Sequence, residues 1–182
     1  MKPPSTMELF ILAAVDRARV VNPTALQRTA GLSLGSLIPT LTRLEKANLV
    51  AGSEDFYQQD RRRRNSYALT EEGRRALEHT WDRCLTTEPR DIGAAIRGVT
   101  VARLMGETPG SVRFLRRTSE DWKYRAHDRQ RAAERLKEEW RRLSVLKQHQ
   151  WMRFHVDYRR LEGESLALSE IADQLEKEHQ VP

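Results

Sequence analysis

The chain is poor in cysteine and in glycine, with one cysteine, Cys84, and nine glycines among 182 residues. A single cysteine excludes an internal disulfide and any zinc site that needs two thiolates. The low glycine content argues against a loop-rich β-sandwich. Apolar residues make up 38% of the chain, below the usual ~45–50%, and charged residues make up 32%, above the usual ~25%. This balance predicts helices with wide solvated faces rather than one large core.

Long apolar segments are also lacking. The longest run, Leu9 to Val15, is far shorter than the ~20 residues that a membrane-spanning helix needs. The N-terminal residues show neither the charge block nor the cleavage site of a signal peptide. We therefore expect a soluble cytoplasmic protein.

The positive charge is unevenly distributed. The net charge is +6, and residues 1–118 carry 19 basic and 13 acidic side chains, whereas residues 119–182 carry 13 of each. The whole excess therefore lies in the first part of the chain. It is a modest indication of an anionic partner such as nucleic acid.

The first fifty residues predict three helices, each with its own start signal. Thr6 can cap a helix over residues 7–17, and Asn22 followed by proline starts a helix over residues 24–30 that ends at Gly31. Ser33 can cap a third helix over residues 34–48. Leucines repeat along the third helix at steps of three and four, which predicts one buried stripe formed by Leu34, Leu37, Leu41 and Leu44.

Two short strands and a basic stretch follow. Residues 49–51 and 66–69 have the composition of strands, and the polar stretch between them contains four consecutive arginines, Arg61 to Arg64. Thr70 can cap another helix, which we expect to extend to about Leu85.

The rest of the chain is predicted to be helical. Asp91 can cap a helix over residues 92–105, Gly106 and Pro109 form a break, and no glycine or proline occurs from Ser111 to Glu162. One helix of that length would be ~75 Å long, which is implausible for a small domain. We therefore expect a turn near residues 145–150 between two antiparallel helices, the second reaching about residue 178.

The order helix, helix, helix, strand, basic loop, strand, helix is that of a winged helix-turn-helix domain. The stretches LSLGSLIPTLTRLEKANLV and RRRRNSYALTEEGRRAL resemble the PadR family of transcriptional regulators over residues 7–85. The positions that match are Gly35, Ser36, Pro39, Leu41, Leu44, Glu45, Leu49, Val50, Tyr67, Leu69, Thr70 and Gly73.

The resemblance implies a mainly α fold, with a winged helix-turn-helix domain and its two-stranded wing over residues 1–88 and a helical dimerisation region over residues 89–182. It also implies a dimeric repressor that binds a pseudo-palindromic operator in double-stranded DNA. The family commonly has a tyrosine before the helix proline, where this chain has Ile38, so the operator sequence of relatives does not carry over.

Two groups of residues are candidates for DNA binding. The helix over residues 34–48 fits the major groove, and side chains off its leucine stripe can reach outward: Ser36, Ile38, Thr40 and Arg43. In the wing, Arg61, Arg62, Arg63 and Arg64 would lie near phosphates or the minor groove, with Tyr67 beside them. The alternatives are an ordinary solvated helix face and a disordered run of charge.

Tryptophans stand out in so polar a chain. Because some regulators of the family bind aromatic compounds, a small aromatic effector could be held by Trp81, Trp122 and Trp140. Packing in the core or in a dimer is the interpretation that we favour, since a tryptophan buries a large area.

No enzyme, cofactor or metal site is predicted. The five histidines include no pair at the spacing of i, i+3 or i, i+4, and the chain contains no phosphate-binding glycine loop. An alternative to DNA binding is a helical adaptor that binds other proteins and has an incidental basic wing. Affinity for duplex DNA that falls steeply with salt would distinguish the two.

Overall fold

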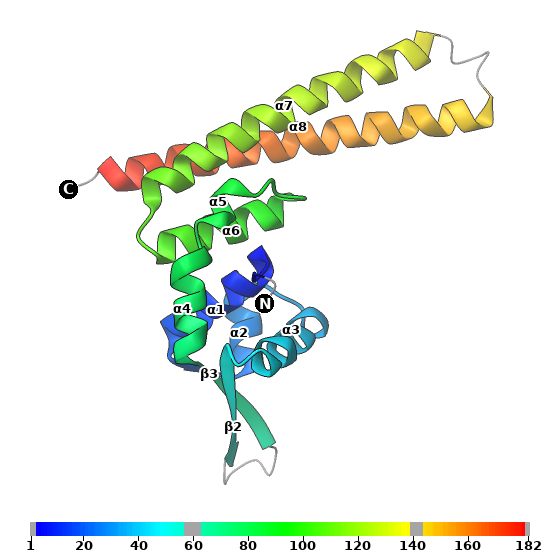
Figure 1. Cartoon of the computed structure of the whole chain (residues 1–182). Coiled ribbons are helices and arrows are strands. Elements are labelled where there is room, and N and C mark those ends of the chain that lie inside the picture. Colours follow the sequence, from blue (N-terminus) through cyan, green and yellow to red (C-terminus); the bar gives the residue numbers. More distant parts are fainter. Residues whose placement is uncertain (1–2, 57–62, 139–143, 181–182) are drawn as a thin grey trace. The chain divides into compact units, whose positions relative to one another are not determined.

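The computed structural model describes residues 3–56, 63–138 and 144–180 (Figure 1). The chain divides into two compact units, the first formed by residues 1–87 and 96–107 and the second by residues 88–95 and 108–182. Each unit is described by itself.

The first unit contains the elements predicted for a winged helix. In chain order they are α1 (Thr6–Ala18), β1 (Val20–Val21), α2 (Pro23–Ala30), α3 (Leu34–Lys46), β2 (Val50–Phe56), β3 (Arg63–Leu69), α4 (Glu71–Thr80), α5 (Arg83–Thr86) and the later part of α6 (Ile92–Leu104). The helix predicted to extend to Leu85 instead ends at Thr80, and the short α5 follows after a turn.

Local capping signals set most helix starts. Asn22, Ser33 and Thr70 each accept a hydrogen bond from a backbone N–H in the first turn of α2, α3 and α4. For α1 the cap is Ser5 and not Thr6, because Ser5 forms a capping box with Glu8 three residues later. The predicted end of α2 at Gly31 is confirmed by its left-handed backbone, with φ of +62°.

The sheet has three antiparallel strands in the order β1-β3-β2. The β2–β3 hairpin pairs Val50 with Leu69 at one end and Phe56 with Arg63 at the other, and it extends away from the helices of this unit (Figure 1). Both strands are longer than predicted, because backbone pairing continues through polar residues whose composition gives no strand signal. The two residues of β1 gave no periodic signal and were missed.

The core of the first unit is built around α1. Six of its side chains are buried, including Leu9, Ile11, Leu12 and Val15, each at most 1% exposed. They pack in one cluster with the leucines of α3 and with Val50, Tyr67 and Leu77. The core therefore fixes α3 and β3 against the same helix.

The start of α4 is locked to the residues before β2. The Thr70 hydroxyl donates to the carbonyl oxygen of Asn48 at 2.6 Å, and the Thr70 N–H donates to that of Leu49 at 3.2 Å. Gly73 lies in the first turn of α4, and a Cβ there would stand 1.9 Å from the Leu49 carbonyl oxygen. Only glycine permits this approach.

The second unit is dominated by two long helices, α7 (Thr108–Glu138) and α8 (Val145–Gln180), which run side by side (Figure 1). The pair is antiparallel as predicted, since Arg116 near the start of α7 forms ion pairs with Asp173 and Glu176 near the end of α8. Buried contacts include Leu115, Trp122, Leu168 and Ala172. No described helix is both long and apolar enough to cross a membrane.

The turn predicted at residues 145–150 was placed too late. Those residues form the first turns of α8, where the Gln148 N–H donates to the Ser144 carbonyl oxygen at 3.0 Å. Ser144 directly precedes α8, at the N-cap position where serine is favoured, and this local signal sets the helix start. As expected, α8 continues through Gly163.

We predict that Gly73→Ala destabilises the first unit by about 1–3 kcal/mol or more, because its Cβ would collide with the backbone of Leu49. Gly163→Ala is the matched control. No atom lies within 4 Å of its Cβ position, so alanine there should stabilise α8 by up to ~1 kcal/mol. Urea titrations of both variants by circular dichroism would measure the change, and equal midpoints would contradict the prediction.

Candidate nucleic-acid interface

A helix-turn-helix is formed by α2 and α3. The turn between them contains Gly31 in its left-handed conformation and Ser33, whose hydroxyl accepts from the Ser36 N–H at 3.3 Å. The leucines Leu37, Leu41 and Leu44 are at most 2% exposed and hold α3 to the core. The opposite side of α3 faces solvent, so the helix has one fixed face and one free face.

Three of the four side chains predicted to face outward from α3 are exposed. Ile38 is 50% exposed, and Ser36 and Arg43 are also exposed. An aliphatic side chain on this face is able to contact a thymine methyl group, which a charged side chain does poorly.

Thr40 is a correction, because it is 4% exposed and does not face outward. Its hydroxyl donates to the Ser36 carbonyl oxygen at 2.8 Å within α3. The buried stripe consists of Leu37, Thr40, Leu41 and Leu44, and Leu34, predicted to begin it, is 37% exposed. Thr40 is small enough to be covered at the edge of the leucine stripe, although a polar side chain at this position is expected to face solvent.

Lys46 and Thr42 also lie on this side of α3 and were not among the predicted contacts. Lys46 is exposed, and it follows Pro39 by seven residues, which places both on the same helix face. Thr42 is half-buried and its hydroxyl donates to the Ile38 carbonyl oxygen at 3.0 Å. The spacing of the leucine stripe alone already places Lys46 on the opposite face of the helix.

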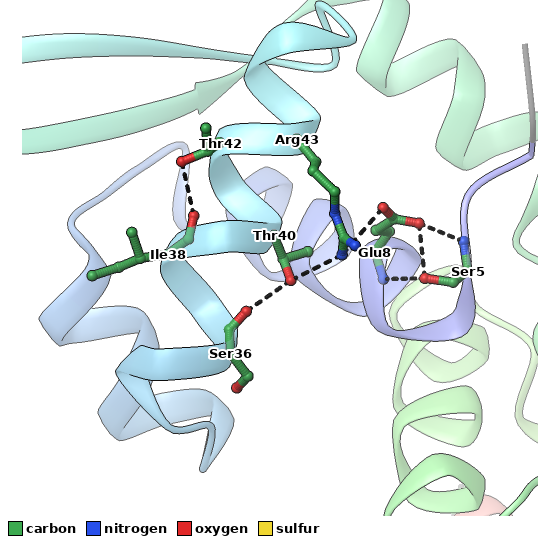
Figure 2. A network of polar contacts seen from close by, with 7 residues as sticks. All are labelled: Ser5, Glu8, Ser36, Ile38, Thr40, Thr42 and Arg43. Carbon is green, nitrogen blue, oxygen red and sulfur yellow. Dashed lines mark hydrogen bonds and ion pairs between the residues drawn. The ribbon is translucent and has the colours of Figure 1, made fainter.

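Arg43 is directed toward α1 (Figure 2). Its Nη2 donates to the Thr40 hydroxyl oxygen at 3.3 Å and lies 3.6 Å from Oε1 of Glu8. The side chain remains 65% exposed, so the guanidinium is held at the surface and not buried.

The arginines of the wing are only partly described. Arg61 and Arg62 lie outside the described residues. The backbone of Arg63 and Arg64 forms the start of β3, opposite Phe56 and Asp55. The expectation that all four arginines lie in a loop was therefore wrong for Arg63 and Arg64, because strand pairing includes them.

Tyr67 is a second correction among the predicted DNA contacts. It is 6% exposed and belongs to the core cluster with α1. The physical reason is the position of β3 in the middle of the sheet, where the side chains that face α1 are covered. Tyr67 therefore serves packing.

The predicted tryptophan set is not brought together within one unit. Trp81 is half-buried against the core of the first unit, Trp122 is 3% exposed in the second unit, and Trp140 lies outside the described residues. Trp122 contributes to a cavity of about 680 Å³ in the second unit, lined mostly by charged side chains such as Arg125, Asp128 and Arg160. Its burial fits the packing interpretation.

Among the described residues, no three His, Cys, Asp or Glu side chains gather as a metal site would need. Cys84 is 2% exposed, and burial, aided by the charge of Asp82, raises the pKa of its thiol to about 11. A thiol with this pKa stays protonated at neutral pH and is a poor nucleophile.

The sequence model of the transcriptional regulator PadR-like family matches residues 24–79, the span from α2 into α4. Residues 24–79 carry a PadR-like domain. The predicted winged helix-turn-helix fold and the resemblance are thereby confirmed. The matching model is that of a family of transcriptional regulators, which favours a DNA-binding regulator over the helical adaptor.

No curated protein matches the chain significantly. Among solved structures, the crystal structure of Bacillus subtilis PadR in complex with operator DNA aligns with 14% identity over 96% of this chain and 99% of that one, with a TM-score of 0.43.

Proposed function

We propose that the protein is a homodimeric repressor that reads a pseudo-palindromic operator, with α3 in the major groove and the basic wing against the backbone. The observation that carries the proposal is the division of α3 into a leucine face fixed to the core and a free face bearing Ser36, Ile38, Arg43 and Lys46. A major groove ~12 Å wide admits one helix presented in this way. Two-fold symmetry of the dimer would require the palindromic form.

The two positive regions would have different tasks. Residues on α3 can approach base edges. The consecutive arginines from Arg61 to Arg64, which precede and begin strand β3, would contact phosphates. Phosphate contacts orient a protein on the duplex and give salt-dependent affinity without sequence preference. We therefore assign base reading to α3 and most of the electrostatic affinity to the wing.

Dimerisation is supported by the exposed apolar side chains of α8. Val145, Leu146, Met152, Val156 and Leu166 are between 46% and 81% exposed within one chain. Apolar side chains spaced along the predicted C-terminal helices also suggest a partner chain, and they are Leu136, Leu143, Leu146, Phe154 and Leu161. Of these, Leu146 is exposed, Leu136, Phe154 and Leu161 are half-buried, and Leu143 lies outside the described residues. Covering these side chains with a second copy would remove apolar surface from water. We assign dimerisation to residues 89–182 and DNA binding to residues 1–88.

The proposal includes control by a small aromatic effector. The cavity beside Trp122 has the volume of a small-molecule site, although its lining is mostly charged and the indole is nearly covered. A constitutive repressor is the alternative, and ligand-dependent release of operator would distinguish it. As a regulator has to reach DNA, we place the protein in the cytoplasm.

The recognition helix is tested by base selection from random duplexes. Ser36→Ala and Arg43→Ala should each change the preferred bases, at a cost of about 1–3 kcal/mol for a lost base contact. Folding should be unaffected, because both side chains are exposed. Arg75→Ala, which removes an exposed arginine from α4, is the control and should select the wild-type sequence. Unchanged preference in both α3 variants would show that another element reads the bases.

The wing is tested by the salt dependence of affinity. If two or three of Arg61, Arg62, Arg63 and Arg64 contact phosphates in each protomer, replacing all four with alanine should flatten the slope of log affinity against log salt by roughly four to five units per dimer. Specific and non-specific affinity should fall together.

A control variant with the same loss of charge replaces four exposed basic residues of α8: Lys147, Arg153, Arg159 and Lys177. It should keep most of the slope. A wing variant with the wild-type slope would refute the assignment, and one that loses only specific binding would mean that the wing reads bases or groove width.

The dimer is tested by sedimentation at micromolar concentration, where we expect twice the mass of one chain. Val156→Lys with Leu166→Lys should weaken self-association by tenfold or more, because two charges per chain would have to be desolvated. Gln150→Lys with Gln174→Lys adds the same charges to exposed polar positions of α8 and is the control. A monomeric wild-type protein would rule out the dimer.

A further inference from the structure

The guanidinium of Arg43 is restrained by two acceptors on two helices (Figure 2). Glu8 belongs to the first turn of α1, and Thr40 precedes Arg43 by one turn of α3. The same nitrogen, Nη2, lies 3.6 Å from the Glu8 carboxylate and 3.3 Å from the Thr40 hydroxyl oxygen. Arg43 is thus tied to an element 35 positions earlier in the sequence.

The two carboxylate oxygens of Glu8 have different partners. Oε2 accepts from the backbone N–H and the hydroxyl of Ser5, each at 2.8 Å, which completes the capping box of α1. Oε1 faces Arg43. The Glu8 side chain is 21% exposed against 65% for Arg43, so the anchor is the more buried and the more fixed of the two.

Thr40 supplies a second, equally fixed acceptor. It is 4% exposed, and its hydroxyl hydrogen is used in the bond to the Ser36 carbonyl oxygen, so the oxygen offers a lone pair to Arg43. A long arginine side chain otherwise has many rotamers, and holding it in one geometry removes an ordering cost on binding.

We propose that Glu8 is a specificity-determining positioning residue for DNA reading by α3. With its guanidinium held and its charge partly offset, Arg43 presents its remaining N–H donors in one direction and does not swing to the nearest phosphate. A free arginine would add sequence-independent affinity, which lowers discrimination between operator and other DNA. The inference rests on the proposed reading of DNA by α3.

The substitution Glu8→Gln separates the capping of α1 from the ion pair with Arg43. Glutamine also completes a capping box, so α1 should keep its cap and the thermal midpoint should change little. The charge that holds Arg43 is lost. The measurement is the ratio of affinity for a selected operator to affinity for random duplex, taken over a range of salt concentrations.

For Glu8→Gln we expect non-specific affinity to rise by about threefold to tenfold and the specificity ratio to fall by about tenfold. The salt slope should steepen by about 0.9 for each protomer whose Arg43 gains a phosphate. Thr40→Val, which removes the second acceptor and keeps the side-chain shape, should lower the ratio in the same direction. Glu45→Gln removes a carboxylate from exposed α3 and is the control for a through-space effect of charge.

Positioning is distinguished from simple charge by a double variant. In an Arg43→Ala background, Glu8→Gln should leave the specificity ratio unchanged, because there is no guanidinium to hold. An equal fall of the ratio with and without Arg43, or no fall in the single variant, would overturn the inference and leave the proposed function standing. If the wild-type protein itself shows no preference among duplexes, the proposed function fails as well.

Discussion

The burial of α1 is the constraint on which the winged domain depends. Six side chains of this helix lie in the core, and they pack with residues of α3, α4 and all three strands. Each fully buried aliphatic side chain contributes about 1.5–3 kcal/mol, so this one helix accounts for much of the driving force that orders the unit. The orientation of α3 and the position of β3 follow from contact with a common partner. The first turn of α1 also carries Glu8, which contacts Arg43 on the exposed face of α3. The helix that stabilises the domain therefore also contacts the exposed face of α3.

The helix boundaries could be predicted because capping signals are local in the sequence. Features that depend on long-range contacts could not be predicted in this way. Asn22, Ser33 and Thr70 act within three residues of themselves, so their capping roles are readable from the sequence. The burial of Thr40 and Tyr67 depends on which neighbours cover them, and polarity or a motif position does not reveal that. The same holds for β1, which exists only because β3 lies beside it. The contact between Glu8 and Arg43 joins residues from separate helices and carried no spacing signal.

The free face of α3 combines chemistry that differs from residue to residue. Ser36 offers a hydroxyl, Ile38 an aliphatic surface and Arg43 a restrained cation, while Lys46 adds an exposed positive charge. Direct readout of base pairs uses such a mixture of donors and apolar groups, whereas simple attraction to phosphate needs only charge. The mixture on α3 therefore suits discrimination between base sequences. The run of arginines at the wing suits sequence-independent binding to phosphates.

The reactivity of the buried Cys84 thiol can report how often the core of the winged domain opens. The residue belongs to the same buried cluster as the side chains of α1, so the sulfur is covered only while this core is closed. A protonated and covered thiol does not react with alkylating reagents, whereas an unfolded one does. The rate of modification would then follow the population in which this core has opened. With one cysteine in the whole chain, that rate would report on the core of the winged domain alone.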